Sequence, residues 1–117
     1  MMALKRRRLL AFDRPAIDSL AEQVLQFALV RCRPELVILF GSAVAGKFDE
    51  MSDLDLLLIF SDLSTATAAR RKLYSGRPLD NHSVDFVCMA RADYDRKKDS
   101  GGIAYVAKNE GKILYQI

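Results

Sequence analysis

The sequence has few cysteines, little net charge and no long apolar run. Its two cysteines, Cys32 and Cys88, lie far apart and form no C-x-x-C pair, so neither a disulfide framework nor a metal knuckle is expected. No apolar stretch approaches the roughly 20 residues that span a bilayer. The formal charge of +3 is too small to indicate nucleic-acid binding by itself. These absences favour a protein of the reducing cytoplasm that binds no membrane.

The N-terminal segment is basic, with Lys5 to Arg8 followed by a short apolar stretch that Asp13 interrupts. A secretory signal peptide needs a longer apolar region, so secretion is not expected. We expect a basic extension over residues 1–12 and a single domain over residues 13–117, which is long enough to bury a core of its own.

Apolar spacing and turn residues predict alternating helices and strands. The first helix is expected to begin after Asp13, with Pro15 in its first turn, and to end before Pro34. Short apolar runs predict strands at residues 35–40, 54–60, 82–89 and 112–117. Helices are expected at residues 63–74 and 100–109, a short helical turn at 42–47, and a polar helix or a turn at 91–99, with Ser42 and Ser100 as N-caps. This order indicates an α/β (α+β) fold, a single domain with a mixed β-sheet and helices packed on it.

Residues 39–48, LFGSAVAGKF, follow the pattern of a P-loop as far as Lys47. The next residue of a P-loop is Ser or Thr, whose hydroxyl holds Mg²⁺, but here it is Phe48. A P-loop also needs a helical crossover of about ten residues or more, and the connection from Lys47 to the strand at 54–60 is too short for one. We therefore exclude a P-loop.

The same short connection predicts that the strand before Gly41 and the strand after Asp53 are antiparallel neighbours. The end of the first then lies beside the start of the second, which places Gly41 and Ser42 next to Asp53 and Asp55. These aspartates are spaced i, i+2, so on a strand both face one side, roughly 6–7 Å apart. One interpretation is a pair of solvated carboxylates at a loop-to-strand transition. The other is a cation site, because two acids at the head of an apolar strand repel each other.

A third acid, Asp85, lies in the apolar stretch HSVDFVCM. The segment between this stretch and the strand at 54–60 is long enough for a helical crossover, so the two strands are expected to run parallel. Asp85 can then face Asp53 and Asp55, although an ion pair with Arg or Lys at a strand edge is an alternative. Three carboxylates beside a Gly-Ser turn suit two Mg²⁺ ions roughly 3.5–4 Å apart and a triphosphate.

Together these residues resemble the signature of the minimal nucleotidyltransferases, members of the DNA polymerase β-like superfamily. That signature has Gly-Ser after a hydrophobic residue, a spacer, D-x-D at the head of an apolar strand and a third aspartate on a later strand. Here it reads Gly41-Ser42, residues 43–52, Asp53-Leu54-Asp55 and Asp85. The Ser52 before D-x-D and the C-terminal NEGKILYQI fit as well. The resemblance covers residues 17–117 and implies the nucleotidyltransferase fold.

The resemblance implies transfer of a nucleoside monophosphate, expected to be AMP from ATP or another nucleoside triphosphate, to a hydroxyl acceptor. The catalytic residues, which would also be the ligands of two Mg²⁺ ions, are then Asp53, Asp55 and Asp85. The nucleotide-binding residues are then Gly41, Ser42, Lys47 and Ser52. Asp85 is also expected to help take the proton of the acceptor, while pyrophosphate leaves.

The turn departs from the family pattern. Many relatives carry arginine after Gly-Ser, where this chain has Ala43 and Ala45. This departure keeps a second hypothesis open, that of a catalytically weak or inactive nucleotidyltransferase-fold module that binds a nucleotide or a partner as an antitoxin or regulatory subunit. The intact set of three acids favours an enzyme.

The acceptor is expected to come from outside this domain. Larger members of the superfamily hold their acceptor with an additional domain, and this sequence has no residues left over for one. We therefore expect a homodimer or a protein partner, and the resemblance suggests the antitoxin of a pair with a small helical HEPN-type toxin. Nucleic acid is not indicated. His82 is expected to be a surface or strand-edge residue.

Overall fold

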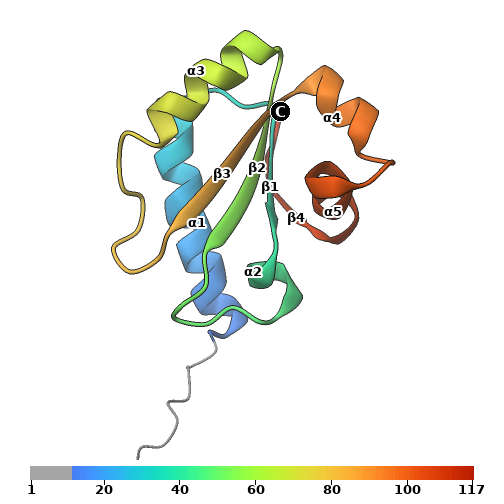
Figure 1. Ribbon diagram of the computed structural model, residues 1–117. Coiled ribbons are helices and arrows are strands. Elements are labelled where there is room, and N and C mark those ends of the chain that lie inside the picture. The colour runs from blue at the N-terminus through green and yellow to red at the C-terminus, as the bar shows by residue number, and fades with distance from the viewer. Residues whose placement is uncertain (1–11) are drawn as a thin grey trace, which may run out of the picture.

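The computed structural model describes residues 12–117, which form a four-stranded sheet with helices on both faces (Figure 1). In chain order the elements are α1 (Arg14–Arg31), β1 (Leu36–Phe40), α2 (Ser42–Ala45), β2 (Leu54–Phe60), α3 (Leu63–Leu73), β3 (Val84–Ala90), α4 (Arg91–Lys97), α5 (Gly102–Glu110) and β4 (Lys112–Gln116). The predicted α+β class is confirmed. The basic cluster from Lys5 to Arg8 lies outside the described residues.

Local sequence explains where the two long helices begin. The Asp13 carboxylate accepts a hydrogen bond from the backbone N–H of Ala16 at 2.9 Å, and Pro15 occupies the first turn, so α1 begins as predicted. The Asp62 carboxylate caps α3 in the same way, through the N–H of Thr65 at 2.7 Å. Each cap satisfies a first-turn N–H group that has no partner within its helix.

Two predicted N-caps are wrong. Ser42 and Ser100 do not cap α2 and α5, because Gly41 and Gly101 occupy the N-cap positions of these helices. Both glycines have positive φ, of 80° and 141°, which a serine at the same position adopts only with strain. The backbone conformation at the start of each helix therefore selects glycine over a capping hydroxyl.

The sheet has the strand order β3-β2-β1-β4. β1 is antiparallel to β2 and β4, and β2 is parallel to β3 with α3 as the crossover. Both predicted strand relations are therefore confirmed. Because β1 has only antiparallel neighbours among the described strands, the turn after it is no P-loop.

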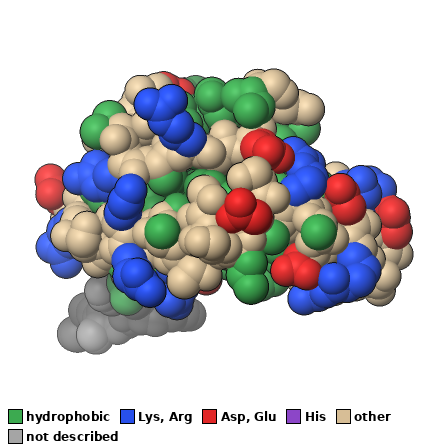
Figure 2. Space-filling model, turned by 90° about the horizontal axis from the view of Figure 1, so that it is seen from above, with side chains coloured by type: hydrophobic (Ala, Val, Ile, Leu, Met, Phe, Trp, Pro, Cys, Tyr) green, Lys and Arg blue, Asp and Glu red, His purple; other side chains and the backbone are tan. Residues whose placement is uncertain are grey.

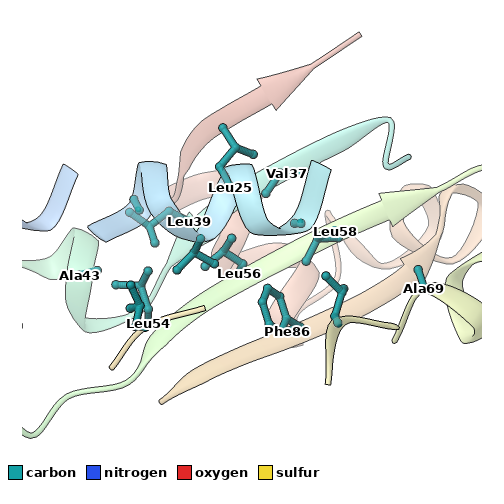
Figure 3. Close-up of a cluster of buried hydrophobic side chains, with 14 of the residues drawn as sticks. Leu25, Val37, Leu39, Ala43, Leu54, Leu56, Leu58, Ala69 and Phe86 are labelled. Carbon is teal, nitrogen blue, oxygen red and sulfur yellow. The ribbon is translucent and has the colours of Figure 1, made fainter. Parts of the chain in front are cut away.

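Two apolar layers pack on the sheet, one on each face. The larger lies between the sheet and helices α1 and α3, where Leu56 and Leu58 of β2 meet Leu25 of α1 and Phe86 of β3 (Figure 3). The smaller lies on the other face, where Leu57 of β2 and its neighbours pack against α4 and α5. β2 is thus apolar on both faces, as its unbroken hydrophobic run requires.

No helix within residues 12–117 is long and apolar enough to cross a membrane.

Candidate active site

The strand register places Asp55 and Asp85 side by side. They are opposite each other in the parallel pair of β2 and β3, where neighbouring strands lie about 4.8 Å apart. Side chains alternate along a strand, so both carboxylates project from the face of Leu57 and Val87, which α4 and α5 cover farther along. The predicted alignment of these two acids is confirmed.

Gly41 lies against Asp55. Phe40, the last residue of β1, pairs with Asp55 across the antiparallel strands, so the chain turns directly beside this carboxylate. A Cβ atom at Gly41 would fall on Asp55 Oδ2, and the backbone has φ 80° and ψ −150°. Only glycine adopts this conformation without strain and leaves room for the carboxylate. The closeness of the Gly-Ser turn to the acids, which the sequence predicted, is confirmed.

Ser42 begins the short helix α2, next to Gly41. The backbone N–H groups of Val44 and Ala45 both donate to the carbonyl oxygen of Gly41 at 3.0 Å. The N–H groups of the first helical residues have no acceptor within the helix. Ser42 is half-buried and follows Gly41, the residue that lies directly against Asp55.

The other predicted site residues lie in the loop between α2 and β2. Asp53 and Lys47 are both exposed, and Asp53 directly precedes β2. Ser52 is turned into the loop itself, since its hydroxyl accepts from the N–H of Asp49 at 3.0 Å and lies 3.2 Å from Asp49 Oδ1. Asp53 therefore lies at the rim of the site, and the Ser52 hydroxyl forms hydrogen bonds within the loop.

His82 anchors this loop, a role that the sequence did not reveal. Its Nδ1 lies 3.0 Å from the carbonyl oxygen of Ser52. Its ring packs 5.0 Å from the ring of Phe48 and 5.2 Å from that of Phe12, centroid to centroid. The predicted surface or strand-edge residue is in fact half-buried. His82 thus links the loop before β3 to the loop before β2, next to Asp53.

The charges at the site repel one another. Burial raises the pKa of Asp55 above its usual value of 3.8, and the charges of Asp85 and Asp53 raise it further. A divalent cation would relieve this repulsion. The donor set consists of carboxylate oxygens, which suit Mg²⁺ rather than a soft metal. The chemistry of these donors therefore fits the cation that the sequence predicts.

The three acids are not gathered on one point. Among residues 12–117, no three acidic, histidine or cysteine side chains lie close enough together to hold a metal ion. Asp53 is at the rim, and the hydroxyl of Tyr74 lies 3.1 Å from Asp85 Oδ1. Asp53 is exposed, so rotation of its side chain toward Asp55 meets little packing, whereas the side chain of Asp85 is held by Tyr74.

The two alanines of the turn have different surroundings. The side chain of Ala43 is fully buried in the larger apolar layer, and its carbonyl oxygen accepts from Arg14 Nη2 at 2.6 Å. Ala45 is exposed. An arginine at position 43 would therefore disrupt the core, whereas position 45 has room for one.

A cavity of about 650 Å³ lies at the other end of the sheet. The residues that line it belong to α1, to α3, to the segment before β1 or to the end of the chain from Tyr115 of β4 onward. They include the cations Arg31, Arg33 and Lys72 but no acid. We call these three cations and the cavity the basic end. Figure 2 looks down on it and shows Lys and Arg side chains around apolar ones on the left of this face. The predicted acids are not part of it.

The fold and these residues define a class of protein, that of small mixed-sheet domains with a Gly-Ser turn beside acids at the strand starts. The family model described as polymerase beta, nucleotidyltransferase, matches residues 22–117. The chain therefore belongs to the polymerase β-like nucleotidyltransferase family.

One solved structure supports the same fold. It is the crystal structure of a protein from Sulfolobus solfataricus with a provisional nucleotidyltransferase assignment, and it is 18% identical with a TM-score of 0.55. The match covers 88% of this chain and 83% of that chain. At this identity the likeness shows the fold alone. No curated protein matches the sequence.

Proposed function

We propose that this protein is a metal-dependent nucleotidyltransferase that moves AMP from ATP to a hydroxyl group of a protein acceptor. The observation that carries the proposal is the pairing of Asp55 with Asp85 across β2 and β3, with Gly41 directly against Asp55. Family membership supports nucleotidyl transfer in general. The metal, the nucleotide and the acceptor are the further steps of the proposal.

Each residue has a role in this mechanism. Asp53, Asp55 and Asp85 would hold two Mg²⁺ ions, which would supply neutralisation of the triphosphate charge. The backbone N–H groups at Gly41 and Ser42 bind the outgoing phosphates. Asp85, at the exposed edge, takes the proton of the acceptor hydroxyl. Catalysis then consists mainly of positioning and of charge stabilisation.

Lys47 and Ser52 are the other two predicted nucleotide-binding residues, and the structure favours a direct contact only for Lys47. Lys47 is exposed after α2 and can reach a phosphate without disturbing the fold. The Ser52 hydroxyl is engaged with Asp49, so its part in nucleotide binding would require the loop to rearrange. We therefore propose Lys47 as a direct phosphate contact and Ser52 as a residue that shapes the loop.

The exposure of Asp85 favours a large acceptor. It lies on β3, an edge strand, and its side chain is exposed, so a hydroxyl on the surface of a second protein can approach it. The family resemblance suggests a small helical HEPN-type toxin as that protein, with this chain as its antitoxin. A second copy of this chain is the other candidate partner.

Two measurements test the proposal. Calorimetry is expected to show ATP binding that depends on Mg²⁺ and is lost in the double variant Asp53→Ala/Asp55→Ala. Co-expression with the small protein encoded next to this one is expected to yield a complex and an AMP adduct detectable by mass spectrometry. Failure to find either product would contradict the protein acceptor, whereas ATP binding without Mg²⁺ dependence would contradict the metal site.

The second candidate is a binding module without chemistry, which the alanines of the turn favour. The variant Ala45→Arg restores the arginine of the family at an exposed position, with Ala45→Gln as the uncharged control. If this chain is an enzyme with a weakened turn, Ala45→Arg is expected to raise the rate of AMP transfer. Binding of ATP and Mg²⁺ with no transfer in any variant would favour the module.

A further inference from the structure

Tyr74, the C-cap of α3, reaches the edge of β3 with its hydroxyl. Its Oη lies 3.1 Å from Asp85 Oδ1, 2.8 Å from the backbone N of Phe86 and 3.2 Å from the carbonyl oxygen of Phe86. The ring stands edge-on to that of Phe86 at 5.6 Å, and the guanidinium of Arg70 lies 5.3 Å from its centroid. These contacts hold an otherwise exposed aromatic side chain in one place.

The surroundings determine where the hydroxyl proton points. Because the N–H of Phe86 donates to Tyr74 Oη, the proton of Tyr74 must point to a different atom. The two acceptors within reach are the carboxylate of Asp85 and the carbonyl oxygen of Phe86. An ionised acceptor forms the stronger hydrogen bond. Tyr74 therefore donates to Asp85 Oδ1 and leaves Oδ2 free.

Asp85 needs such a partner if it is to bind a cation. It is exposed on an edge strand, where a short side chain exchanges rotamers freely. Within residues 12–117, the recorded hydrogen bond to its carboxylate comes from Tyr74. Carboxylates that bind metals are usually hydrogen-bonded in turn, and the loss of such a partner weakens metal binding about 10–100-fold.

We propose that Tyr74 is a positioning residue for Asp85, holding Oδ1 so that Oδ2 is presented to a divalent cation shared with Asp55. This inference rests on the proposed function, since it needs a cation at the site. Tyr74 acts through Asp85 and contacts neither nucleotide nor acceptor. It explains how the least buried of the strand carboxylates keeps a defined direction.

The variant Tyr74→Phe removes the hydroxyl and keeps the ring. Calorimetric titration of Mn²⁺ into the protein with a non-hydrolysable ATP analogue is expected to show about tenfold weaker Mn²⁺ binding. Tyr105→Phe is the matched control, because Tyr105 is 43% exposed, close to the 47% of Tyr74, and lies on α5 away from Asp85. It is expected to bind Mn²⁺ as the wild type does.

The substitution Tyr74→Phe in an Asp85→Asn background distinguishes a role of Tyr74 through Asp85 from a purely structural role. Tyr74→Phe is expected to cause no further loss of Mn²⁺ binding there, since its effect passes through the carboxylate. A role limited to capping the edge N–H of Phe86 would produce the same loss in both backgrounds. Equal losses, or full Mn²⁺ affinity in Tyr74→Phe, would overturn the inference.

Hydrogen exchange distinguishes failure of this inference from failure of the proposed function. In the metal-free protein, the amide of Phe86 is expected to exchange faster in Tyr74→Phe than in the wild type, because its acceptor is gone. Unchanged exchange shows that the contact does not form and overturns the inference alone. If the Phe86 amide exchanges faster in Tyr74→Phe but the wild type binds no Mn²⁺, the proposed function is contradicted, and so is the inference that rests on it.

Discussion

The two ends of the sheet differ in charge and in the way they are built. At the acidic end, Asp55 and Asp85 are the second residues of β2 and β3, and Gly41 brings the backbone of the turn against Asp55. At the basic end, cations surround a cavity lined by apolar side chains, among them Val30 and Ile117, each 81% exposed.

The cavity and the candidate active site therefore lie at different ends of the sheet. The basic end has a cavity of about 650 Å³, and its cations come from helix surfaces and from the segment before β1. Arg31 is held there by a 3.1 Å hydrogen bond to the carbonyl oxygen of Phe27 and by stacking on the Phe27 ring. The acidic end is determined by strand register, which admits no slip because a shift of one residue would bury the carboxylates in the core. The acidic end is therefore the candidate site whose carboxylates are placed by the fold itself.

The largest expected effect comes from Asp55→Asn. We expect the rate of AMP transfer to fall at least about a thousandfold, because the loss of a shared cation ligand removes several kcal/mol of charge stabilisation. Transfer of a labelled α-phosphate measures the rate, and Lys72→Gln at the basic end is the control. If Asp55→Asn keeps transfer while Lys72→Gln loses it, the assignment of the two ends is reversed.

Gly41→Ala tests the close contact between the Gly41 backbone and Asp55, with Gly46→Ala as a control. Both glycines have nearly the same φ, of 80° and 79°, but a Cβ at Gly46 meets nothing within 4 Å. Gly46→Ala, in the left-handed helical region, is expected to cost about 1–2 kcal/mol of stability through backbone strain. Gly41→Ala is expected to cost more, because ψ −150° at this φ is nearly restricted to glycine and because the new Cβ displaces Asp55. We expect nucleotide binding to weaken about tenfold or more in Gly41→Ala alone. Equal binding in the two variants would show that the contact has no role.

Much of the acidic end could be predicted because it depends on short-range features. The short connection between Gly41 and Asp53 permits only antiparallel strands, and the longer one before Asp85 permits a parallel crossover. The order β3-β2-β1 follows from these two relations, whereas the pairing of β4 with β1 was not predicted. The candidate acids were therefore recognisable from spacing alone.

Contacts made through loops could not be predicted. The position of Tyr74 depends on where α3 ends relative to β3, and no periodic pattern marks its hydroxyl as a partner of Asp85. His82 meets the ring of Phe48 only after both loops have folded. The predicted cap at Ser42 is wrong because positive φ at Gly41 moved the N-cap by one residue. Such features arise from tertiary packing, which local propensity does not record.

The pH dependence of stability is expected to differ in sign between the ends. The pKa of Asp55 is raised by burial and by neighbouring acids, so its contribution to stability is full below pH 3.8 and is lost as the pH rises through the folded pKa. The hydrogen bond from the N–H of Thr65 lowers the pKa of Asp62 at the other end. The contribution of Asp62 to the free energy of unfolding is present above pH 3.8 and is lost as the pH falls through the pKa of Asp62 in the folded protein.

Urea unfolding of Asp55→Asn and Asp62→Asn across a pH series measures this contrast. As the pH rises, Asp55→Asn is expected to gain stability relative to the wild type, whereas Asp62→Asn is expected to lose it. Asparagine keeps the capping geometry of Asp62, so the charge is the main difference. Shifts of the same sign in both variants would contradict the electrostatic account of the acidic end.

The smallest expected effect belongs to the double variant Arg33→Gln/Lys72→Gln at the basic end. β1 alone separates Arg33 from Gly41 by about 17 Å of strand, roughly twice the distance over which physiological salt screens charges. We therefore expect the affinity for ATP with Mg²⁺, measured by calorimetry, to change less than about twofold. Neither cation forms an ion pair within residues 12–117, so little stability should be lost. A tenfold loss of ATP affinity would instead place the triphosphate at the basic end, because salt screens charges too strongly for so large an effect across the length of β1.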